Sequence, residues 1–467
     1  MTTGCMLVGT NYEPPDMVVP DAWHSNLSKD IHSGRSSVET WWEKFDDPTL
    51  NRLIDRAREA NPDLKAALER VTEAQAAREV SRSYLFPSVD ANGTFQRTRN
   101  SDNAVAPRAP ANNPFNTYST GFNAGWELDF FGGVRRLVES SNASAEAVEE
   151  AWRDATVVLL SEVALNYIDY RTLEERIRVA KENIKGQRES LRLTKDRLDA
   201  GLASELDVSQ VETNVRTSET LIPLLQTQLI LAKNRLSTLV GGYPGSIDKW
   251  LAKGRGIPVP RRSAGIGIPA DLIRSRPDIR LAERHLAAQT AQIGVAEADL
   301  YPRFTLSGNF NLDAGNSGDL LHRDARAYGF GPSFRWNIFS AGRIKNNIAI
   351  EQSRTRQAYN AYESTVLKAV EDVESSLATI AGARNRSASL NQASTAARKT
   401  VSLVNDKFRE GLVDSLNVID AERTLFNTED EATVVRGQIS AGFVALYRSL
   451  GGGTPMKLKA EPTKDKK

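Results

Sequence analysis

The sequence has very little cysteine and histidine, the residues most often used to build disulfides and metal centres. Its 467 residues include one cysteine, Cys5, and four scattered histidines, which are His24, His32, His285 and His322. One thiol cannot form an internal disulfide, and histidines without ligand spacing give no metal-binding pattern. We therefore expect no metal site.

An excess of charge of one sign and long hydrophobic runs are missing as well. The chain has 60 basic and 59 acidic residues, which leaves a formal charge of +1. Nucleic-acid binding usually shows as a basic excess, so no nucleic-acid partner is expected. No run of about 20 apolar residues is present, so no transmembrane helix is expected.

The common catalytic signatures are also absent. The chain contains no HExxH, no GxGxxG or P-loop that opens a βα unit, and no GxSxG. Acidic pairs such as Glu149-Glu150 and Glu174-Glu175 fall within expected helices, where charged runs are usually solvated. We predict that the protein is not an enzyme and carries no cofactor.

The single cysteine is informative because of its position. Gly4 precedes Cys5, and a polar segment with Pro14 and Pro15 follows, which is typical of the end of a bacterial lipoprotein signal. Thr2 stands where leucine is usual, and the basic and apolar parts of a signal are absent. We expect the true start to lie upstream and Cys5 to carry diacylglycerol and acyl lipid. The alternative is an incidental cysteine.

The chain contains an internal duplication. Arg197 to Val208 realigns with Lys407 to Val418, and Val240-Gly-Gly realigns with Leu450-Gly-Gly, both 210 positions later. Nearer the start of each half the offset is 215, for example between Leu85-Phe-Pro and Leu300-Tyr-Pro. Landmarks in the same order at nearly constant offsets indicate a tandem duplication.

Each half is predicted to begin with a helix and two strands. Polar and apolar residues alternate over about 86–98 and 117–131 in the first half, and over about 303–313 and 327–339 in the second. Period-two alternation predicts strands with one apolar and one polar face.

A very long stretch without proline follows each pair of strands. Residues 134–200 and 344–410 each contain a single glycine, and their apolar residues recur at helical spacing. Each stretch is therefore predicted to be one helix of about 67 residues, which spans roughly 100 Å.

The long helices are expected to turn back at glycines. Gly201 and Gly411 can adopt the left-handed conformation of a helix C-cap. The residues placed to cap the next helices, which run to about 240 and 450, are Ser204, Asp207, Asp414 and Asn417. Each half is thus predicted to contain a helical hairpin, with tips at 201–207 and 411–417.

These patterns divide the chain into five parts. Residues 243–275 contain four prolines and many glycines, so they are expected to form an irregular connector. The expected parts are an N-terminal anchor segment at 1–60, repeat 1 at 61–242, the connector at 243–275, repeat 2 at 276–452 and a disordered tail at 453–467.

The four strands predict a trimer. Four strands cannot close a barrel, and unpaired sheet edges are untenable in lipid. Three copies supply twelve strands, which can close into a membrane β-barrel, and the same threefold operation would close the helices into an α-helical barrel. The predicted fold is thus mainly α with a membrane β-barrel, in which the apolar strand face meets lipid and the polar face lines a lumen.

Three stretches carry recognisable motifs. They are Trp41-Trp-Glu-Lys-Phe45-Asp-Asp-Pro48, Ile268-Pro-Ala-Asp-Leu-Ile-Arg-Ser-Arg276-Pro-Asp-Ile-Arg280, and Trp336-Asn-Ile-Phe-Ser-Ala-Gly342-Arg343. Together, over about 41–452, they resemble the TolC-like outer-membrane efflux proteins, especially their OprM/NodT lipoprotein branch.

This resemblance implies a trimeric, passive duct in the Gram-negative outer membrane that extends into the periplasm and exports drugs or other small molecules. It places the segments 1–60 and 243–275 at the periplasmic equator of the channel. The implied partners are two further copies of the chain, outer-membrane lipid, a periplasmic membrane-fusion adaptor and an inner-membrane RND transporter.

The resemblance also implies a gate near the periplasmic tips. Leu416 and Asp420 match aperture rings by position, Asp207 matches an acidic position in the first tip, and Arg409 is its plausible constraining partner. Val413 stands where the TolC pattern has a gating arginine, so a more apolar latch is expected. The expected adaptor contacts are Gly201, Leu202, Ser204, Gly411, Leu412 and Asp414. The structural alternative is a merely solvated Asp420 and ordinary hairpin packing of Leu416.

Two other functions remain open at this point. A helical rod would explain the long helices but not the four alternating strands. A channel for type I protein secretion would have the same fold, although the lipoprotein-like start and the motifs favour small-molecule efflux.

Overall fold

The computed structural model describes residues 7–25, 31–32, 38–101, 114–253, 256–260, 264–265 and 267–453. The chain forms two compact units. Unit 1 comprises Met1–Asp16, Arg70–Val148 and Leu281–Glu363, and unit 2 comprises Met17–Glu69, Glu149–Arg280 and Ser364–Lys467. Each unit therefore contains segments of both sequence repeats. The structure is mainly helical with a small antiparallel sheet.

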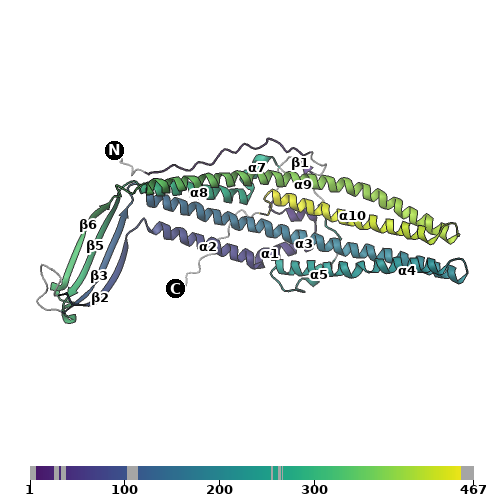
Figure 1. The fold of residues 1–467 in the computed structure, drawn as a ribbon, viewed down its shortest axis with the longest axis horizontal. Helices are drawn as coiled ribbons and strands as arrows, with labels where there is room; N and C mark the ends of the chain where they lie inside the picture. Colours follow the sequence, from purple (N-terminus) through teal and green to yellow (C-terminus); the bar gives the residue numbers. More distant parts are fainter. Residues whose placement is uncertain are drawn as a thin grey trace. The chain divides into compact units, whose positions relative to one another are not determined.

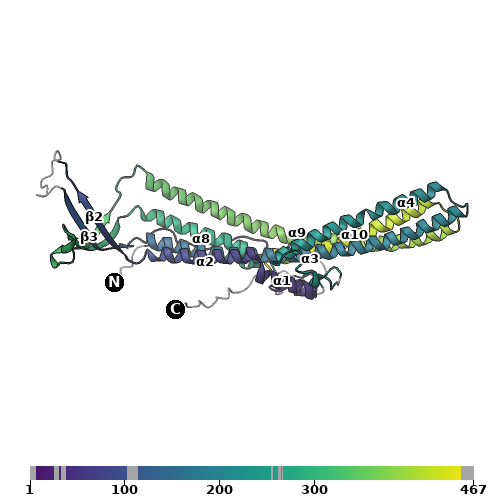
Figure 2. The ribbon, with the colours of Figure 1, turned by 90° about the horizontal axis from the view of Figure 1, so that it is seen from below.

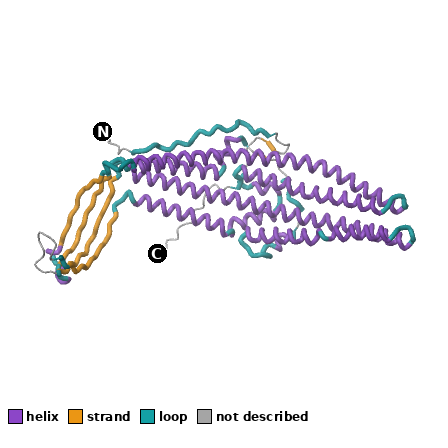
Figure 3. The backbone as a smooth tube through the Cα atoms, in the orientation of Figure 1, coloured by secondary structure: helices purple, strands orange, loops and turns teal. Residues whose placement is uncertain are grey.

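Unit 1 contains the four-stranded antiparallel sheet, whose order is β2-β3-β5-β6 (Figure 1 and Figure 3). The strands are β2 (Ser88–Thr98), β3 (Phe115–Leu128), β5 (Arg303–Ala314) and β6 (Arg326–Arg335). The duplication is visible in this order, because each repeat supplies one hairpin and the hairpins join through β3 and β5. In the described part of the chain, the outer strands β2 and β6 each have one edge without a partner strand.

The register separates the sheet into the two faces that the alternation predicts. Asp90 pairs with Asn123, which pairs with Asn309 on the next strand, so one face is polar. Phe122 pairs with Phe310 on the other face, where large aromatic side chains remain exposed. A large exposed apolar surface marks a place that contacts lipid or protein.

Two tryptophans fix the sheet to the loops that precede it, once in each repeat. The indole N–H of Trp126 donates to the carbonyl of Leu85 at 3.0 Å, and that of Trp336 donates to Leu300 at 3.0 Å. The ladder ends at the pair of Arg303 and Arg335, because β5 begins there. The strand β6 therefore ends at Arg335, earlier than the predicted residue 339.

The strand β3 also ends earlier than the expected residue 131. The carboxylate of Asp129 accepts hydrogen bonds from the backbone N–H groups of Val134 and Arg135. These are two of the N–H groups at a helix start that have no partner within the helix. Asp129 thus leaves the ladder to cap the following helix.

The N-terminal segment of unit 1 is fixed against the start of that helix. The buried guanidinium of Arg136 donates to the carbonyls of Val8 and Gly9 and to the side chain of Asn11. The backbone N–H of Val8 in turn donates to the carbonyl of Phe131. Residues 8–11 therefore lie at the junction between β3 and the first long helix.

The two long helices of the repeats are equal in length. They are α3 (Gly133–Asp199) and α9 (Arg343–Arg409), each of 67 residues. The helices that open the repeats, α2 (Pro62–Ser83) and α8 (Pro277–Ala298), are also equal, with 22 residues each. The opening helices and the long helices of the two repeats thus match in length.

The helices that return from the two tips differ. In repeat 2 a single helix, α10 (Ser415–Ser449), follows the tip. In repeat 1 the expected helix to 240 is instead two helices, α4 (Glu205–Glu219) and α5 (Leu221–Leu239). Pro223 explains the break, because it has no N–H to donate to the carbonyl of Glu219 and its ring clashes with that carbonyl.

In the core of unit 2, the N-terminal segment packs against helices of both repeats. The short helix η1 (Trp41–Phe45) precedes α1 (Pro48–Ala60), whose start is capped by the side chain of Asp47. Trp41 is fully buried and stacks on Tyr447 of α10, with ring centroids 5.5 Å apart. The hydroxyl of Tyr167 donates to Asp47 at 2.8 Å. The motif that begins at Trp41 is therefore part of the core of this unit.

The connector contains little regular structure. Its elements are α6 (Asp248–Leu251), β4 (Ala264–Gly265) and α7 (Pro269–Ser275), and β4 pairs in parallel with β1 (Ile31–His32). Two short helices, η2 (Ser317–Asp319) and η3 (Arg323–Ala325), lie between β5 and β6. None of the helices in the described part of the chain has the length and apolar character needed to cross a lipid bilayer.

Candidate functional site

The two hairpin tips, both in unit 2, have the same backbone geometry. Gly201 and Gly411 have φ values of +72° and +78°, the left-handed conformation that favours glycine. The next residue in each tip donates its N–H five positions back, from Leu202 to Arg197 and from Leu412 to Lys407. This is the Schellman pattern of hydrogen bonds that ends a helix.

The helices that leave the tips are capped at the predicted positions. The Ser204 hydroxyl accepts from the backbone N–H of Asp207, and the Asp207 carboxylate accepts from the backbone N–H of Ser204 at 2.9 Å. These reciprocal bonds form a capping box at the start of α4. At the start of α10, the carboxylate of Asp414 accepts from the backbone N–H of Asn417 at 3.1 Å.

Asp207 also links the first tip to the second. Its carboxylate accepts a hydrogen bond of 2.7 Å from the hydroxyl of Ser415, the first residue of α10. Hydrogen bonds from Ser204, and then from Ser415, hold the pKa of Asp207 below its usual value. The acidic position predicted for the first tip is therefore ionised at neutral pH and contacts repeat 2.

Arg409, the predicted partner of Asp207, makes a different contact within the chain. Its guanidinium pairs with Asp406 on the same helix at 3.2 Å. Arg197, which sequence reasoning did not select, contacts the second tip instead through the carbonyls of Phe408 and Arg409. A basic residue in the last turn before a C-cap glycine was the available signal.

Leu416 and Asp420 lie on one exposed face of α10. They are four residues apart, a spacing that places side chains next to each other on a helix. Leu416 is 54% exposed, and its equivalent in repeat 1, Leu206, is 66% exposed. Together with Ile419 and Phe426, Leu416 lines a hollow of about 720 Å³ between α10 and the break that separates α4 from α5.

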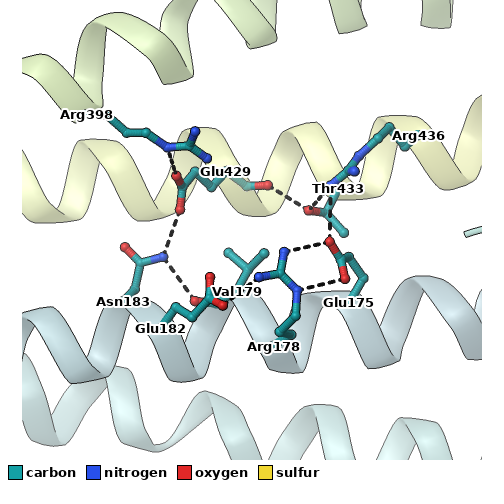
Figure 4. Close-up of polar contacts among 9 residues, drawn as sticks. All are labelled: Glu175, Arg178, Val179, Glu182, Asn183, Arg398, Glu429, Thr433 and Arg436. Atoms are coloured by element: carbon teal, nitrogen blue, oxygen red, sulfur yellow. Dashed lines mark hydrogen bonds and ion pairs between the residues drawn. The ribbon is translucent and has the colours of Figure 1, made fainter. Parts of the chain in front are cut away.

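A row of polar contacts joins α3 to α10 behind the tips (Figure 4). Asn183 of α3 donates to Glu429 of α10, and Arg398 of α9 donates to the same carboxylate at 2.7 Å. Further along the pair, Glu175 accepts from Arg178 and forms an ion pair with Arg436 at 3.6 Å. These contacts bind the outgoing helix of repeat 1 to the return helix of repeat 2.

One contact between α3 and α10 is buried and has no charged partner. The Ser190 hydroxyl donates to the carboxyl group of Glu422, which is only 6% exposed. The second carboxyl oxygen of Glu422 is buried and has no hydrogen-bond partner among the described residues. Burial raises the pKa of this carboxyl group, against the opposing effect of the Ser190 bond.

The predicted adaptor contacts are accessible at the tips. Leu202 is 67% exposed and Leu412 is 69% exposed, so each tip presents a leucine to solvent. Cys5, the predicted lipid attachment site, and residues 454–467 of the predicted tail lie outside the described residues. In the described part of the chain no group of three or more histidine, cysteine, aspartate or glutamate side chains could bind a metal ion.

The two hairpin tips also share a hollow. Side chains from both repeats meet around a hollow of about 330 Å³ that is lined by Arg197, Asp207 and Ser415, among others. Figure 1 and Figure 2 show the two hairpins, formed by the ends of α3 and α9 with α4 and α10.

The sequence matches the family model of the outer membrane efflux protein over residues 53–242 and 268–452. The two matched segments correspond to the two repeats, and the gap between them falls in the connector. The resemblance inferred from the motifs is thereby confirmed. The family is one of efflux channels, so the prediction that the chain is not an enzyme is also confirmed.

Curated relatives and solved structures agree with this match. Nodulation protein T of Rhizobium leguminosarum bv. trifolii is 30% identical over 454 residues, which cover 97% of this chain and 95% of the relative. The pyoverdine export outer membrane protein OpmQ of Pseudomonas aeruginosa is 29% identical and is covered to 96%. The structure of the outer-membrane channel OprN superposes with a TM-score of 0.89 at 34% identity, over 96% of this chain and 99% of that one.

The family model covers most of the chain, the relatives align over nearly their whole length, and the fold is that of a solved channel. This chain belongs to the outer membrane efflux protein family.

Proposed function

We propose that the protein is the outer-membrane exit duct of a tripartite efflux system for small molecules. The observation that carries this proposal is the combination of a four-stranded amphipathic sheet with two long helical hairpins in one family member. The relatives support small molecules as cargo, because one of them is named for pyoverdine export.

The duct is a homotrimer on this proposal. Among the residues that the structure describes, one edge of β2 and one edge of β6 have no partner strand, and unpaired backbone groups are costly in lipid. Pairing β6 of one copy with β2 of the next satisfies both edges, and three copies give a closed sheet of twelve strands. The exposed aromatic face then meets lipid, and the face with Asp90, Asn123 and Asn309 lines the lumen.

A lipid on Cys5 fits the same arrangement. Val8, three residues later, is held at the junction of β3 and α3 by Arg136 and Phe131. The strand β3 of the proposed membrane-facing sheet ends at this junction, so a lipid on Cys5 has only a short length of chain to reach the bilayer. The lipid adds an anchor to the apolar face of the sheet.

The partners of the duct are a periplasmic membrane-fusion adaptor and an inner-membrane RND transporter. The exposed leucines of the two tips, Leu202 and Leu412, offer apolar contacts for the adaptor. In the trimer, Leu416 and Asp420 form rings that narrow the periplasmic end, and Asp207 and Arg409 constrain the tips. Three carboxylates around a narrow axis repel one another and favour cations.

The proposal is tested by expressing the full-length precursor, extracting the product from outer membranes in detergent, and measuring its intact mass and oligomeric mass. We expect a trimer whose subunit mass includes a diacylglycerol and an acyl chain. The matched variant Cys5→Ser should lose the lipid mass and keep the trimer, because the sheet edges drive assembly. A water-soluble monomer without lipid would contradict the duct and the anchor together.

A further inference from the structure

Arg197, in the last turn of α3, reaches from the first hairpin to the backbone of the second. One guanidinium nitrogen donates to the carbonyls of Phe408 and Arg409, the latter at 3.3 Å. Another donates to the carbonyl of Leu202 in its own tip at 3.4 Å. The guanidinium also lies over the ring of Phe408, with its carbon 4.9 Å from the ring centroid. One side chain thus contacts the first tip and the end of α9, directly before the second tip.

The carbonyls that Arg197 contacts are among those a helix cannot satisfy by itself. The last four carbonyls of a helix have no partner within it and carry partial negative charge. In α9, the carbonyl of Lys407 accepts from Leu412, and that of Phe408 accepts from Gly411. The carbonyl of Arg409 accepts from Arg197. The guanidinium therefore completes the C-cap of a helix from the other repeat.

The contact runs in one direction only. The position equivalent to Arg197 in the second repeat is Lys407, 210 residues later. Lys407 is exposed, and no side-chain hydrogen bond or ion pair of Lys407 is found in the described part of the chain. The duplicated position has thus become a tether in one repeat and a solvated charge in the other.

A further contact joins the first tip to the second. It is the hydrogen bond of 2.7 Å between Asp207 and the buried Ser415. Gly411 lies against the same guanidinium, since a Cβ at Gly411 would be 3.5 Å from an Arg197 nitrogen. Arg197 therefore contacts the chain before Gly411, and Asp207 contacts it after Gly411, at the residue directly before Leu416.

We propose that Arg197 is a positioning residue of the gate, which holds the second hairpin tip, and with it Leu416 and Asp420, in the closed arrangement. This inference rests on the proposed channel function. It assigns the restraint to contacts between a side chain and backbone carbonyls, so the restraint does not depend on an acidic partner. Opening then requires the guanidinium to leave the end of α9.

The test is single-channel recording of purified trimers in planar bilayers, with Arg197→Ala, Arg197→Lys and the matched control Lys407→Ala. We expect the ratio of open to closed time to rise roughly tenfold in Arg197→Ala, as for the loss of hydrogen bonds to a charged group. Lysine keeps the charge without the planar fork, so Arg197→Lys should lie between. Lys407→Ala should behave as wild type.

Two further measurements separate the failure of this inference from the failure of the channel proposal. Leu416→Ala serves as the positive control, because it alters the proposed aperture without touching Arg197. Wild-type gating in Arg197→Ala beside a leaky Leu416→Ala would overturn the tether and leave the channel intact. An equal effect of Lys407→Ala would also overturn it, because charge alone would then explain the result.

Hydrogen exchange decides the case in which Arg197→Ala gives too few trimers to record. Amide exchange of residues 405–416 should be faster in Arg197→Lys than in Lys407→Ala, while exchange in α1 stays the same in both. Equal exchange of residues 405–416 in the two variants would contradict a specific tether.

Discussion

The two hairpins of this protein began as copies and now differ in how their return helices are built. The outgoing helices have the same length, and both tips begin with a glycine that has a positive φ. The return helix of repeat 1 breaks at Thr220, whereas α10 of repeat 2 continues over 35 residues. The difference lies in what each return helix packs against.

Equivalent positions show this difference directly. Glu422 of α10 is buried against Ser190, while its counterpart Glu212 in α4 pairs with Arg216 near the surface. Thr433 of α10 is fully buried, while its counterpart is Pro223, which follows the break. A helix that is packed along its length cannot tolerate an interruption, and a helix at the surface can. Repeat 2 thus supplies the packed return helix, and repeat 1 supplies the tether.

The largest expected effect comes from exchanging the residues at the break. Thr433→Pro introduces proline into the packed interior of α10 and should destabilise the protein by about 3 kcal/mol or more. Pro223→Thr allows the backbone bond from residue 223 to Glu219 and should change stability by only about 1 kcal/mol in either direction. Thermal melting of both variants in detergent measures the contrast. Equal melting temperatures of the two variants would show that proline affects stability equally in the two return helices.

The pair of equivalent glutamates predicts a pH dependence. The raised pKa of Glu422 means that the folded protein keeps a proton at pH values where the unfolded chain has lost it. The contribution of protonated Glu422 to the stability of the fold is therefore complete below the ordinary pKa of 4.5. It is lost as the pH rises through the raised pKa. Glu422→Gln imitates the protonated form, so it should remove this slope and be the more stable protein at pH 8.

The control for this prediction is Glu212→Gln, at the equivalent position in repeat 1. It should keep the wild-type slope, because the side chain of Glu212 is 42% exposed and pairs with Arg216. The slope is measured from the melting temperatures of both variants between about pH 5 and pH 8, because buried carboxyl groups can have pKa values in this range. A wild-type slope in Glu422→Gln would show that the buried carboxyl is not its source.

Asp207 predicts a pH dependence opposite to that of Glu422, because its contact is lost at acidic pH. Its pKa is lowered, so the bond to Ser415 persists at neutral pH and is lost as pH falls through the lowered value. Asp207→Asn should therefore weaken the tip most at neutral pH and have no effect in strong acid. Hydrogen exchange of residues 411–416 at pH 7 measures this loss, and unchanged exchange would contradict it.

The smallest expected effects are those of the two helix caps. Ser204→Ala removes one member of a capping box, and Asp414→Ala removes a single capping carboxylate. Each substitution should cost about 1 kcal/mol, the usual value for a capping residue. Melting temperatures that differ strongly between the two would show that one cap has a role beyond its own helix.

Local signals in the sequence were sufficient for most of the fold. The glycines at 201 and 411 and the caps at Ser204 and Asp414 act within a few residues, so they predict the tips directly. The strands follow from their alternation, although Asp129 and the end of the β5–β6 ladder shorten two of them. The break at Thr220 was missed because the helical pattern continues on both sides of Pro223.

The contacts between repeats could not be predicted in the same way. Ser190 and Glu422 are 232 positions apart, and Arg197 and Phe408 are 211 apart. Their meeting depends on how α3 lies against α9 and α10, which no local pattern determines. For the same reason the resemblance suggested Arg409 for the first tip, whereas within the chain Arg409 pairs with Asp406. The gate roles of Leu416, Asp420, Asp207 and Arg409 stay predictions.

The central claim is a trimeric duct that is narrowed by the second tip, and planar-bilayer conductance tests it most directly. The double variant Leu416→Ala with Asp420→Ala should raise the small conductance of the wild-type trimer several-fold, because the matched positions of the aperture lose bulk and charge. The equivalent pair in repeat 1, Leu206→Ala with Gln210→Ala, should leave it unchanged. No conductance from any of these trimers, or equal increases from both pairs, would contradict the account.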